Sequence, residues 1–456
     1  MSESVFWAKS KETLSRQERE AEVLTLIQHQ LHRVYERVAF YREHYQRAGF
    51  HPSQVKSLED FTRKVPIITK QMLREDQAKH PPFGSYLGAE NGTIARIHGS
   101  SGTTGTPTLY AISKNDWSYI AEVMAQAFYT AGVRPDDKVQ LATLFSLFMG
   151  GWGALLATER IGATAFPLGA GETERQLQLM WRVGSTVLVT TPTYALHMLE
   201  TARTLGYDTA QSPLRLGIFV GEPGAGVPAT RRTLEKGWGI SVRDMGTTSE
   251  MTPWATNVEC EAGSGMHVIQ DQVWTEIVDK SDPNLPVPEE GEGVIIYTHL
   301  RRDSQPMIRF HSGDESLMTY KPCACGRTYP RLPFGVYGRI DDMLIIRGVN
   351  VYPSQVQRSL LEVAGTGVEF LIVMESKGAL DQATVQVEID PSLKAEDFDA
   401  LAADLGERVQ RKLKNDTNIN FTIEVLRPNT LPRAVSKAKR VDDRRPKYRP
   451  VVAPMT

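Results

Sequence analysis

Short apolar runs alternate with helical patterns through the central part of this chain. Each run ends at or near a glycine or proline and is followed by a stretch with helical periodicity. The runs lie at 139–148, 163–169, 185–194 and 214–222, and the helical stretches at 173–183, 194–205 and 227–236. Such alternation predicts β–α–β units and a parallel sheet. Because ligands of these sheets bind beyond the carboxyl ends of the strands, the segments that follow the runs are candidate site segments.

The segment from Arg96 to Thr108, RIHGSSGTTGTPT, has the composition of a phosphate-binding loop. Its three glycines allow positive φ and a close approach of the backbone to a ligand. Its hydroxyl donors are Ser100, Ser101, Thr103, Thr104 and Thr106. Consecutive amides in such a loop form a concave anion site. The lysine of a P-loop is missing before the last hydroxyl, so the segment is not that motif. A plain Ser/Thr/Gly surface loop is the alternative.

Charge and composition exclude several functional classes. The net charge of −2 and the pI near 6.6 give no indication of a nucleic-acid or anionic-membrane partner. The first residues lack the apolar core of a signal peptide, and no run is long enough to cross a membrane. Three cysteines cannot build a disulfide framework and suit a reducing compartment, so we expect a cytoplasmic protein. At 456 residues, two or three domains are expected.

Helices are predicted around the loop as well. Residues 12–48 carry one apolar helical face, formed by Leu24, Ile27, Leu31, Val34, Val38 and Tyr41. Thr69 is a predicted helix cap within 58–80, and 117–132 again has a helical pattern. Residues 268–320 are β-rich. A smaller α+β pattern follows a boundary near Gly338, with helices at 354–363 and 396–414.

The cysteines form two short clusters with one histidine. Cys323 and Cys325 flank one alanine before a glycine, and Cys260 is followed seven positions later by His267. Three cysteines and one histidine are a recognised tetrahedral zinc set of the closed, structural kind. The sequence does not show the two halves converging, so free thiols are the alternative.

Several separate pieces occur in one order: SSGTTGTPT, GGWGALLATERIGATAFPLGAGETERQ, GEP, TSE, RFHSGD, GRIDDMLIIRGVNVYPSQ and SKAKRV. In this order they resemble the phenylacetate–CoA ligase group of the adenylate-forming superfamily, over roughly residues 60–445. The resemblance implies an α/β fold with a large, multi-subdomain ATP- and acid-binding N-terminal domain (1–337) that contains parallel sheets. It further implies a hinge at 338–342 and a small, mobile α+β C-terminal domain (343–456).

The resemblance also implies roles for single residues. Ser100, Ser101, Gly102, Thr103 and Thr104 match the loop over the β- and γ-phosphates. The adenine side is matched by Gly221, Glu222, Pro223 and Asp244, and the α-phosphate by Ser249. Asp314 matches the acid that holds the ribose diol, and Arg339 matches the residue near ribose and phosphate. Asp341 matches the hinge. Glu250 matches the Mg²⁺ ligand, and Lys437 matches the mobile lysine of adenylation.

Each of these residues has a plainer interpretation in the sequence alone. Glu250 has the pattern of a buried structural carboxylate, and Asp314 that of a turn residue after glycine. Asp341 with its neighbour Asp342 also suits a metal site or a solvated turn. Lys437 suits a solvated basic tail.

The acyl pocket is expected at the segment that follows the first apolar run. Phe145, Phe148, Met149, Gly150 and Trp152 lie there, and in the resembling enzymes this segment lines the acyl pocket. No lysine or arginine accompanies them, so an aromatic monoacid is expected; core packing is the alternative.

The expected activity is adenylation of that acid by ATP with Mg²⁺, followed by transfer to CoA, with structural Zn²⁺. A carrier-protein thiol, another acceptor, or a nucleotide-binding protein with a degenerate site are the alternatives. A homodimer is compatible with the sequence, which does not decide the oligomeric state.

Overall fold

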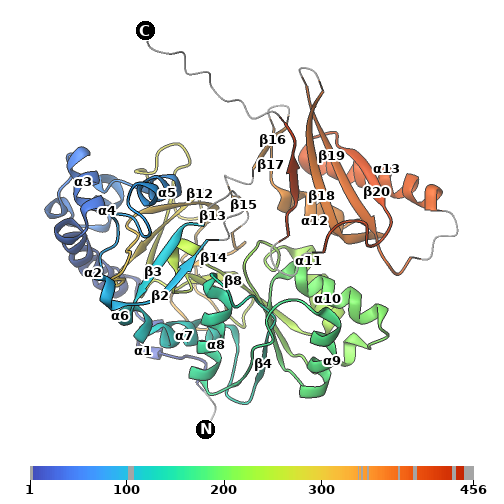
Figure 1. The fold of residues 1–456 in the computed structure, drawn as a ribbon, viewed down its shortest axis with the longest axis horizontal. Helices are drawn as coiled ribbons and strands as arrows, with labels where there is room; N and C mark the ends of the chain where they lie inside the picture. The colour runs from blue at the N-terminus through green and yellow to red at the C-terminus, as the bar shows by residue number, and fades with distance from the viewer. Residues whose placement is uncertain are drawn as a thin grey trace. The chain divides into compact units, whose positions relative to one another are not determined.

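The computed structural model describes residues 4–100, 107–336, 338–339, 343–346, 349–377, 380–393, 398–433 and 438–445. The chain forms two compact units (Figure 1). The first unit contains residues 1–227 and 231–340, and the second contains 228–230 and 341–456. The assignment of a hinge to 338–342 stays a prediction, and Asp341 lies outside the described residues.

The N-terminal part of the first unit is helical. Its elements are α1 (Lys9–Glu12), α2 (Arg16–Arg37), α3 (Ala39–Arg47), η1 (Pro52–Gln54), α4 (Leu58–Lys64) and α5 (Lys70–Lys79). Residues 12–48 therefore do not form one helix, because Val38 takes an extended conformation between α2 and α3. Val34, Val38 and Tyr41 are nevertheless all buried in one core, so the predicted apolar face is confirmed. Thr69 caps α5 through its side chain, as predicted.

An eight-stranded sheet forms the centre of the first unit. Its strands are β4 (Lys138–Leu141), β5 (Thr164–Phe166), β6 (Val187–Thr190), β7 (Leu216–Phe219), β8 (Ser241–Gly246), β9 (Asn257–Glu259), β10 (Met266–Val268) and β14 (Arg331–Leu332). The order is β14-β10-β9-β8-β7-β6-β4-β5. From β5 to β8 all neighbours are parallel, whereas the strands beyond β8 are antiparallel. The predicted parallel sheet is therefore confirmed.

Helices connect the successive strands of this sheet (Figure 1). They are α8 (Met149–Ile161), α9 (Thr173–Val183), α10 (Pro192–Thr204), η3 (Thr209–Gln211), α11 (Pro228–Trp238) and η4 (Ser249–Met251). Helices α6 (Lys114–Ser118) and α7 (Ile120–Ala131) precede β4. Helix α9 has the predicted bounds. Buried residues of α7, α8 and the strands, among them Phe128, Ala157, Val139 and Ile218, form one core.

The first apolar run is only partly a strand. Strand β4 ends at Leu141, although the run continues to Phe148. Beyond it, the Leu147 carbonyl oxygen accepts a hydrogen bond from the Gly99 amide at 3.0 Å. At Leu147 the backbone thus bonds to the strand that enters the glycine loop, whereas the Ala142 amide still bonds to Val189 of β6. This explains why apolar composition alone overestimated the strand.

A second sheet packs with the N-terminal helices. Its strands are β1 (Ile68–Thr69), β13 (Phe310–Leu317), β12 (Glu292–His299), β11 (Val273–Val278) and, paired with β13, β15 (Gly338–Arg339). Strands β2 (Ile94–Gly99) and β3 (Leu109–Ser113), after η2 (Asn91–Thr93), form a hairpin. Strand β1 is parallel to β13, and residues of α2, β11 and β12 share one core.

The second unit is a small α+β structure. It contains β16 (Leu344–Ile346), β17 (Val349–Val351), α12 (Pro353–Leu361), β18 (Thr366–Lys377), β19 (Leu380–Ile389), α13 (Phe398–Thr417), β20 (Thr422–Leu426) and β21 (Val441–Asp443). Its main sheet has the order β20-β19-β18-β21, with α12 and α13 contributing to the same core. The predicted fold class is thereby confirmed. Among the described residues, no helix has the length and apolarity to cross a membrane.

The capping hydrogen bond of Thr69 should be measurable in stability. Its hydroxyl accepts from the Met72 amide at 3.3 Å. We expect Thr69→Ala to lower the free energy of unfolding by about 1 kcal/mol, because this amide loses its partner. Urea denaturation, monitored by circular dichroism, measures the change in the free energy of unfolding. Thr25→Ala is the control, since Thr25 is exposed and its hydroxyl donates to the Ala21 carbonyl within α2 at 3.1 Å rather than capping a helix. An equal loss in both variants would contradict a capping role.

Candidate active site

The two ends of the glycine loop lie side by side. The Ser100 amide donates to the Thr108 carbonyl at 3.0 Å, and the Thr108 amide donates to the Ser100 hydroxyl at 3.0 Å. Ser100 is buried at this junction. The other predicted phosphate contacts, Ser101, Gly102, Thr103 and Thr104, lie outside the described residues. Strands β2 and β3 therefore form the base from which the loop extends.

The candidate acyl segment lies directly against strand β2. The Leu147 carbonyl contacts both the Gly99 amide and Nδ1 of His98, each at 3.0 Å. The Arg96 guanidinium stacks over the rings of Trp117 and Trp152, with 4.2 and 5.0 Å to the ring centroids. The acyl segment and the base of the glycine loop are thus one connected structure.

Two predicted pocket residues contact each other within this segment. The rings of Phe145 and Trp152 meet edge to face, with centroids 5.3 Å apart. Phe145, Phe148, Met149 and Trp152 are all half-buried, and Gly150 is exposed. This partial exposure fits a wall better than the interior of a core.

The predicted adenine residues lie on or directly after two adjacent strands. In the parallel pair β7 and β8, Phe219 lies opposite Asp244. After β7 the chain turns through Gly221, which has φ +93°, a conformation that favours glycine. The carboxylate of Glu222 then accepts from the Thr193 amide at 2.9 Å, and Pro223 follows. These residues occupy the carboxyl edge of the sheet, where the sequence predicts a ligand.

Asp244 is a buried carboxyl in an acidic environment. Its burial and the neighbouring Glu259 raise its pKa to about 7, although Arg231 acts in the opposite direction. Glu259 is held in place because it accepts from the Asp244 amide at 3.1 Å and from Arg231 at 2.5 Å. A Cβ at Gly226 would lie 2.7 Å from the Asp244 carboxylate, so any larger residue here would require this carboxylate to shift.

Glu250 is a buried carboxylate beside a lysine. It lies in η4 with only 3% of its surface exposed. Its Oε1 lies 3.1 Å from the Lys70 ammonium, and the Tyr110 hydroxyl donates to it at 3.1 Å. Burial acts to raise its pKa, but Lys70 and Arg339 outweigh burial, so that the pKa lies below the usual range. Glu250 is therefore ionised, and Ser249 beside it is half-buried.

Sequence reasoning missed Lys70, Tyr110 and Arg302 around Glu250. Lys70 is the first residue of α5, directly after the predicted cap Thr69. Arg302 is fully buried and donates to the carbonyls of Glu250 and Ala111 at 3.3 and 3.1 Å. Burial lowers the pKa of Arg302 to about 10. The sequence does show that Lys70 is a lysine at the start of a capped helix. Its distance from Glu250 along the chain, however, gives no indication that the two side chains meet.

Asp314 and Arg339 are brought together by strand pairing. They are opposite each other in the antiparallel pair of β13 and β15. Nε of Arg339 lies 3.3 Å from the Asp314 carboxylate, which is buried. Both predictions thus fall at one place in the first unit. Lys437 lies outside the described residues, as does Asp341.

The cysteines and the histidine converge. The ligand atoms of Cys260, His267, Cys323 and Cys325 all lie within 4.8 Å of one another. Nε2 of His267 is 3.3 Å from the Cys325 sulfur, while its Nδ1 is 3.3 Å from the Tyr329 carbonyl. Such a contact at the second nitrogen orients a ligating imidazole. The sequence left this convergence open, and the structure decides it.

The chemistry of the cluster fits a metal ion. The thiol of Cys260 and the ring of His267 hold the pKa of the Cys325 thiol well below its ordinary value, and a thiolate is the form that binds metals. The turn after Cys323 closes through a hydrogen bond from the Gly326 amide, with Gly326 at φ +81°. The four donors are the set that structural zinc sites use.

Residues near the N-terminus pack around this turn. The Arg327 guanidinium pairs with the buried carboxylate of Glu12 at 2.7 Å and donates to the Val5 carbonyl at 2.5 Å. The Arg19 guanidinium stacks over the Tyr329 ring at 3.9 Å. The segment before α2 is therefore fixed to the cysteine-containing turn.

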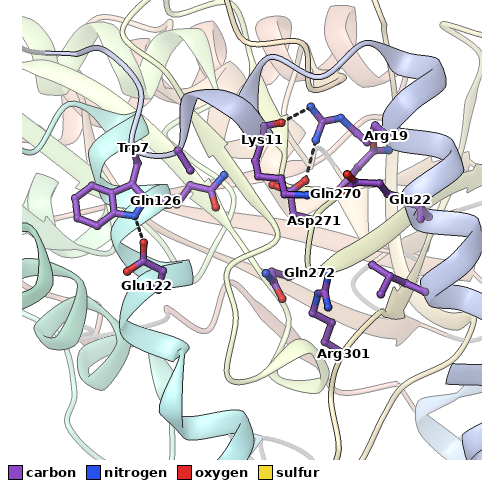
Figure 2. Close-up of a pocket in the computed structure, with 13 residues that line it drawn as sticks. Trp7, Lys11, Arg19, Glu22, Glu122, Gln126, Gln270, Asp271, Gln272 and Arg301 are labelled. Atoms are coloured by element: carbon purple, nitrogen blue, oxygen red, sulfur yellow. Dashed lines mark hydrogen bonds and ion pairs between the residues drawn. The ribbon is translucent and has the colours of Figure 1, made fainter. Parts of the chain in front are cut away.

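A pocket of about 190 Å³ lies beneath the same segment (Figure 2). Figure 2 shows the Trp7 indole directed at Glu122, with which it forms a hydrogen bond of 2.6 Å. Arg19 pairs with Asp271 at 2.8 Å. None of the predicted site residues that the structure describes lines this pocket, and its polar groups Trp7 and Glu122, and Arg19 and Asp271, bind each other. We assign the pocket a structural role.

Comparison with known proteins identifies the protein family to which this chain belongs. A family model described as "AMP-binding enzyme" matches residues 14–299, and one described as "AMP-binding enzyme C-terminal domain" matches residues 348–445. The chain therefore belongs to the family of AMP-binding, adenylate-forming enzymes.

Curated relatives and solved structures narrow the group. A phenylacetate-coenzyme A ligase from Thermus thermophilus is 36% identical over 90% of this chain and 93% of its own length. One from Escherichia coli is 33% identical over 95% and 97%. A 2-hydroxyisobutyryl-CoA ligase in complex with R3-HIB-AMP is 39% identical, covers 97% of this chain and 93% of its own, and has a TM-score of 0.90. Within the family, this chain is a phenylacetate–CoA ligase-like enzyme of the acid–CoA ligase class, as the sequence predicted.

The raised pKa of Asp244 predicts a pH-dependent stability. The folded carboxyl has a pKa of about 7 against an ordinary 3.8, so the folded state binds the extra proton between these values. Stability contributed by this proton is therefore lost as the pH rises through this window. We compare the free energies of unfolding of Asp244→Asn and of the native chain. As the pH rises from 5 to 8, we expect this difference to change in favour of the variant by more than about 1 kcal/mol. Denaturation of both chains at pH 5 and at pH 8 measures this change. A stability difference that is the same at both pH values would contradict a raised pKa of Asp244.

Proposed function

We propose that this protein is an ATP-dependent aryl-acid–CoA ligase. It adenylates an aromatic carboxylic acid, releasing pyrophosphate, and then transfers the acyl group to CoA, releasing AMP. The observation that carries the proposal is the grouping of an ionised Glu250 with the Asp314–Arg339 pair in a chain of the acid–CoA ligase class. The proposed compartment is the cytoplasm, where ATP and CoA are available.

In the first step, a carboxylate attacks the α-phosphate of ATP. The bond between the α- and β-phosphates breaks, and pyrophosphate leaves with the electron pair. Two anions must approach each other, so cations and amide donors have to offset their charge. In the proposed arrangement Arg339 and Lys437 supply the positive charge at the α-phosphate, beside Ser249. The loop residues from Ser100 to Thr104 donate to the β- and γ-phosphates.

The nucleotide is held by groups at the edge of the sheet. Two carboxylate oxygens of Asp314 suit the vicinal ribose hydroxyls. Gly221, Glu222, Pro223 and Asp244 surround the adenine. Glu250 is the residue that would hold Mg²⁺, because it is ionised although buried. When bound, this ion neutralises phosphate charge.

In the second step, the sulfur of CoA attacks the acyl carbonyl carbon. The bond from the acyl carbon to the phosphate oxygen breaks, AMP leaves with the electron pair, and the thiol proton passes to solvent. The relatives include a 2-hydroxyisobutyryl-CoA ligase in complex with 2-HIB-AMP and CoA, 40% identical over 98% of this chain and with a TM-score of 0.74. We propose that Asp341 is the hinge between the two half-reactions.

An aromatic acid is the proposed substrate class. Phe145 and Trp152 offer an edge-to-face pair that a planar ring can extend, with Phe148 and Met149 in the same segment. Several relatives are phenylacetate-coenzyme A ligases. The small hydroxy acid named for the 2-hydroxyisobutyryl-CoA ligases is the competing class, and the assay includes it.

Cys260, His267, Cys323 and Cys325 would hold a zinc ion. Four protein ligands leave no open position, so the ion would supply structural cross-linking rather than catalysis. It would join β10 to the turn at 323–326 within the first unit.

The test of the function is acid-dependent pyrophosphate release. The chain is incubated with ATP, Mg²⁺ and a panel of aryl acids, short alkyl acids and 2-hydroxyisobutyrate, each with and without CoA. We expect release with an aryl acid, and AMP and thioester once CoA is added. Preference for an alkyl acid would contradict the aromatic class. Adenylate without thioester would show a different acceptor.

Glu250→Gln should abolish most of this activity. Loss of its charge removes the proposed Mg²⁺ ligand, and we expect kcat for pyrophosphate release to fall about 10²–10³-fold, the scale on which loss of a single charge-stabilising group acts. Glu59→Gln is the control, since Glu59 is exposed and pairs with Arg63 on the same helix, α4. Wild-type activity in Glu250→Gln would exclude the assigned role.

Zinc should be present in the purified chain and should stabilise it. We expect elemental analysis to find one zinc per chain. Cys325→Ser removes a zinc ligand and should lower the Tm, by about 2–4 °C for each kcal/mol of unfolding free energy that is lost. Ser264→Ala is the control: the Ser264 hydroxyl lies 3.3 Å from the Cys323 sulfur, but it is outside the ligand set. Full stability of a zinc-free Cys325→Ser chain would refute a structural ion.

A further inference from the structure

A tight turn follows strand β14 in the first unit. Strand β14 ends at Leu332, and the Gly335 amide donates to the Leu332 carbonyl at 3.1 Å, which closes a turn over residues 332–335. Gly335 has φ +66°, a conformation that favours glycine. A Cβ at Gly265 would lie 2.5 Å from the Leu332 carbonyl oxygen, so the turn packs closely on the residue before β10. The backbone of the turn is therefore well supported.

The turn contacts both the predicted adenine residue Asp244 and the strand that carries the predicted ribose residue Asp314. A Cβ at Gly335 would be 3.0 Å from the Asp244 carboxylate, so the backbone of the turn runs directly beside this carboxyl. The Gly335 carbonyl also accepts from the Ser316 hydroxyl at 2.7 Å, and Ser316 follows Asp314 by two residues on β13. Phe334, next to Gly335, therefore lies where the nucleotide is expected.

Phe334 is the exposed residue of this turn. Its exposed fraction is 65%, whereas Leu332 and Gly335 are buried. A Cβ at Gly226 would lie 3.5 Å from the Phe334 carbonyl oxygen, so the residue is also close to the segment that follows Pro223. Single exposed apolar residues are common, and exposure alone assigns no role. The position of Phe334 beside the predicted nucleotide residues is what gives its exposure a meaning.

The predicted adenine residues themselves offer no aromatic surface. None of the four has an aromatic side chain: Gly221, Glu222, Pro223 and Asp244. Phe219, opposite Asp244 in the pair of β7 and β8, is fully buried, and Tyr297 on β12 has only 1% of its surface exposed. These two rings are therefore part of the protein interior. A purine base has two π faces, and aromatic side chains that stack on a base strengthen its binding about tenfold or more.

We propose that Phe334 binds the adenine ring of ATP by stacking. The inference rests on the proposed function, in which the nucleotide lies along Asp244 and Asp314. The phenyl ring covers one face of the base and excludes water from it. Because the backbone of the turn is already held by Gly265 and Ser316, little conformational freedom is lost when the nucleotide binds. Phe334 thus contributes to affinity for the base and takes no part in the bond changes at the α-phosphate.

The test is ATP binding without the acid, so that no adenylate forms. Isothermal titration calorimetry with ATP and Mg²⁺ compares the native chain with Phe334→Ala, Phe334→Leu and Phe334→Tyr. We expect the Kd for ATP to rise about tenfold in Phe334→Ala, the scale of base–aromatic stacking. Phe334→Leu keeps the apolar bulk but not the ring, and its Kd should rise as well. Phe334→Tyr keeps the ring and should retain the native Kd within about twofold.

Acid-dependent pyrophosphate release gives a second readout. We expect the KM for ATP to rise by the same factor in Phe334→Ala, while kcat at saturating ATP stays within about twofold, because the contact is equal in the ground state and the transition state. Leu205→Ala is the control and should change neither constant. Leu205 is also exposed, at 44%, but it follows the end of α10, whereas Thr193 at the start of this helix contacts Glu222.

An unchanged Kd for ATP in Phe334→Ala, or a loss confined to kcat, would overturn the stacking role and leave the proposed function intact. Native affinity in Phe334→Leu would also overturn it, because apolar contact would then suffice. If the native chain binds no ATP at all, the proposed function fails, and the inference fails with it. Should Phe334→Ala not fold, the comparison of Phe334→Leu with Phe334→Tyr still decides.

Discussion

A single buried carboxylate, that of Glu250, determines much of the arrangement in the first unit. An ionised carboxylate is costly to remove from water unless cations and donors surround it. Lys70 and Tyr110 contact its side chain, Arg302 binds its backbone carbonyl, and Arg339 adds to the positive field. These residues come from α5, β3, the segment after β12 and β15, so the need to satisfy one charge joins distant parts of the chain.

Much of the fold could be predicted from the sequence because local patterns, such as strand–helix alternation and helix caps, agree with the folded structure. The alternation from residue 163 to 236 gave the parallel strands and the helices between them, and Thr69 was correctly identified as a cap. Errors arose where apolar composition did not determine the backbone conformation. Val38 is extended and interrupts the helix although it stays on the apolar face, and Leu147 bonds to Gly99 instead of extending β4. Gly99 lies far from Leu147 in the sequence, so the residues around Leu147 do not reveal this contact.

The site could be predicted only as far as motifs are contiguous. Glu250, Asp314 and Arg339 were predicted because each belongs to a recognisable piece, whereas Lys70 is an ordinary lysine until the β1–β13 pairing places it beside Glu250. The cysteines show the same limit: their spacing suggested a ligand set, but only the approach of the 323–326 turn to β10 brings the atoms together. The identity of the acid depends on pocket shape, which residue types alone do not specify.

The attachment of the N-terminal segment to the cysteine-containing turn has a practical consequence for handling the protein. Glu12 and Val5 hold Arg327, and Arg19 covers Tyr329, so shortening the chain to the start of α2 would leave a buried guanidinium without its carboxylate. Affinity tags and fusion partners joined at this end therefore require a flexible spacer before Val5. Crystallisation variants trimmed at the front should keep everything from that residue onward.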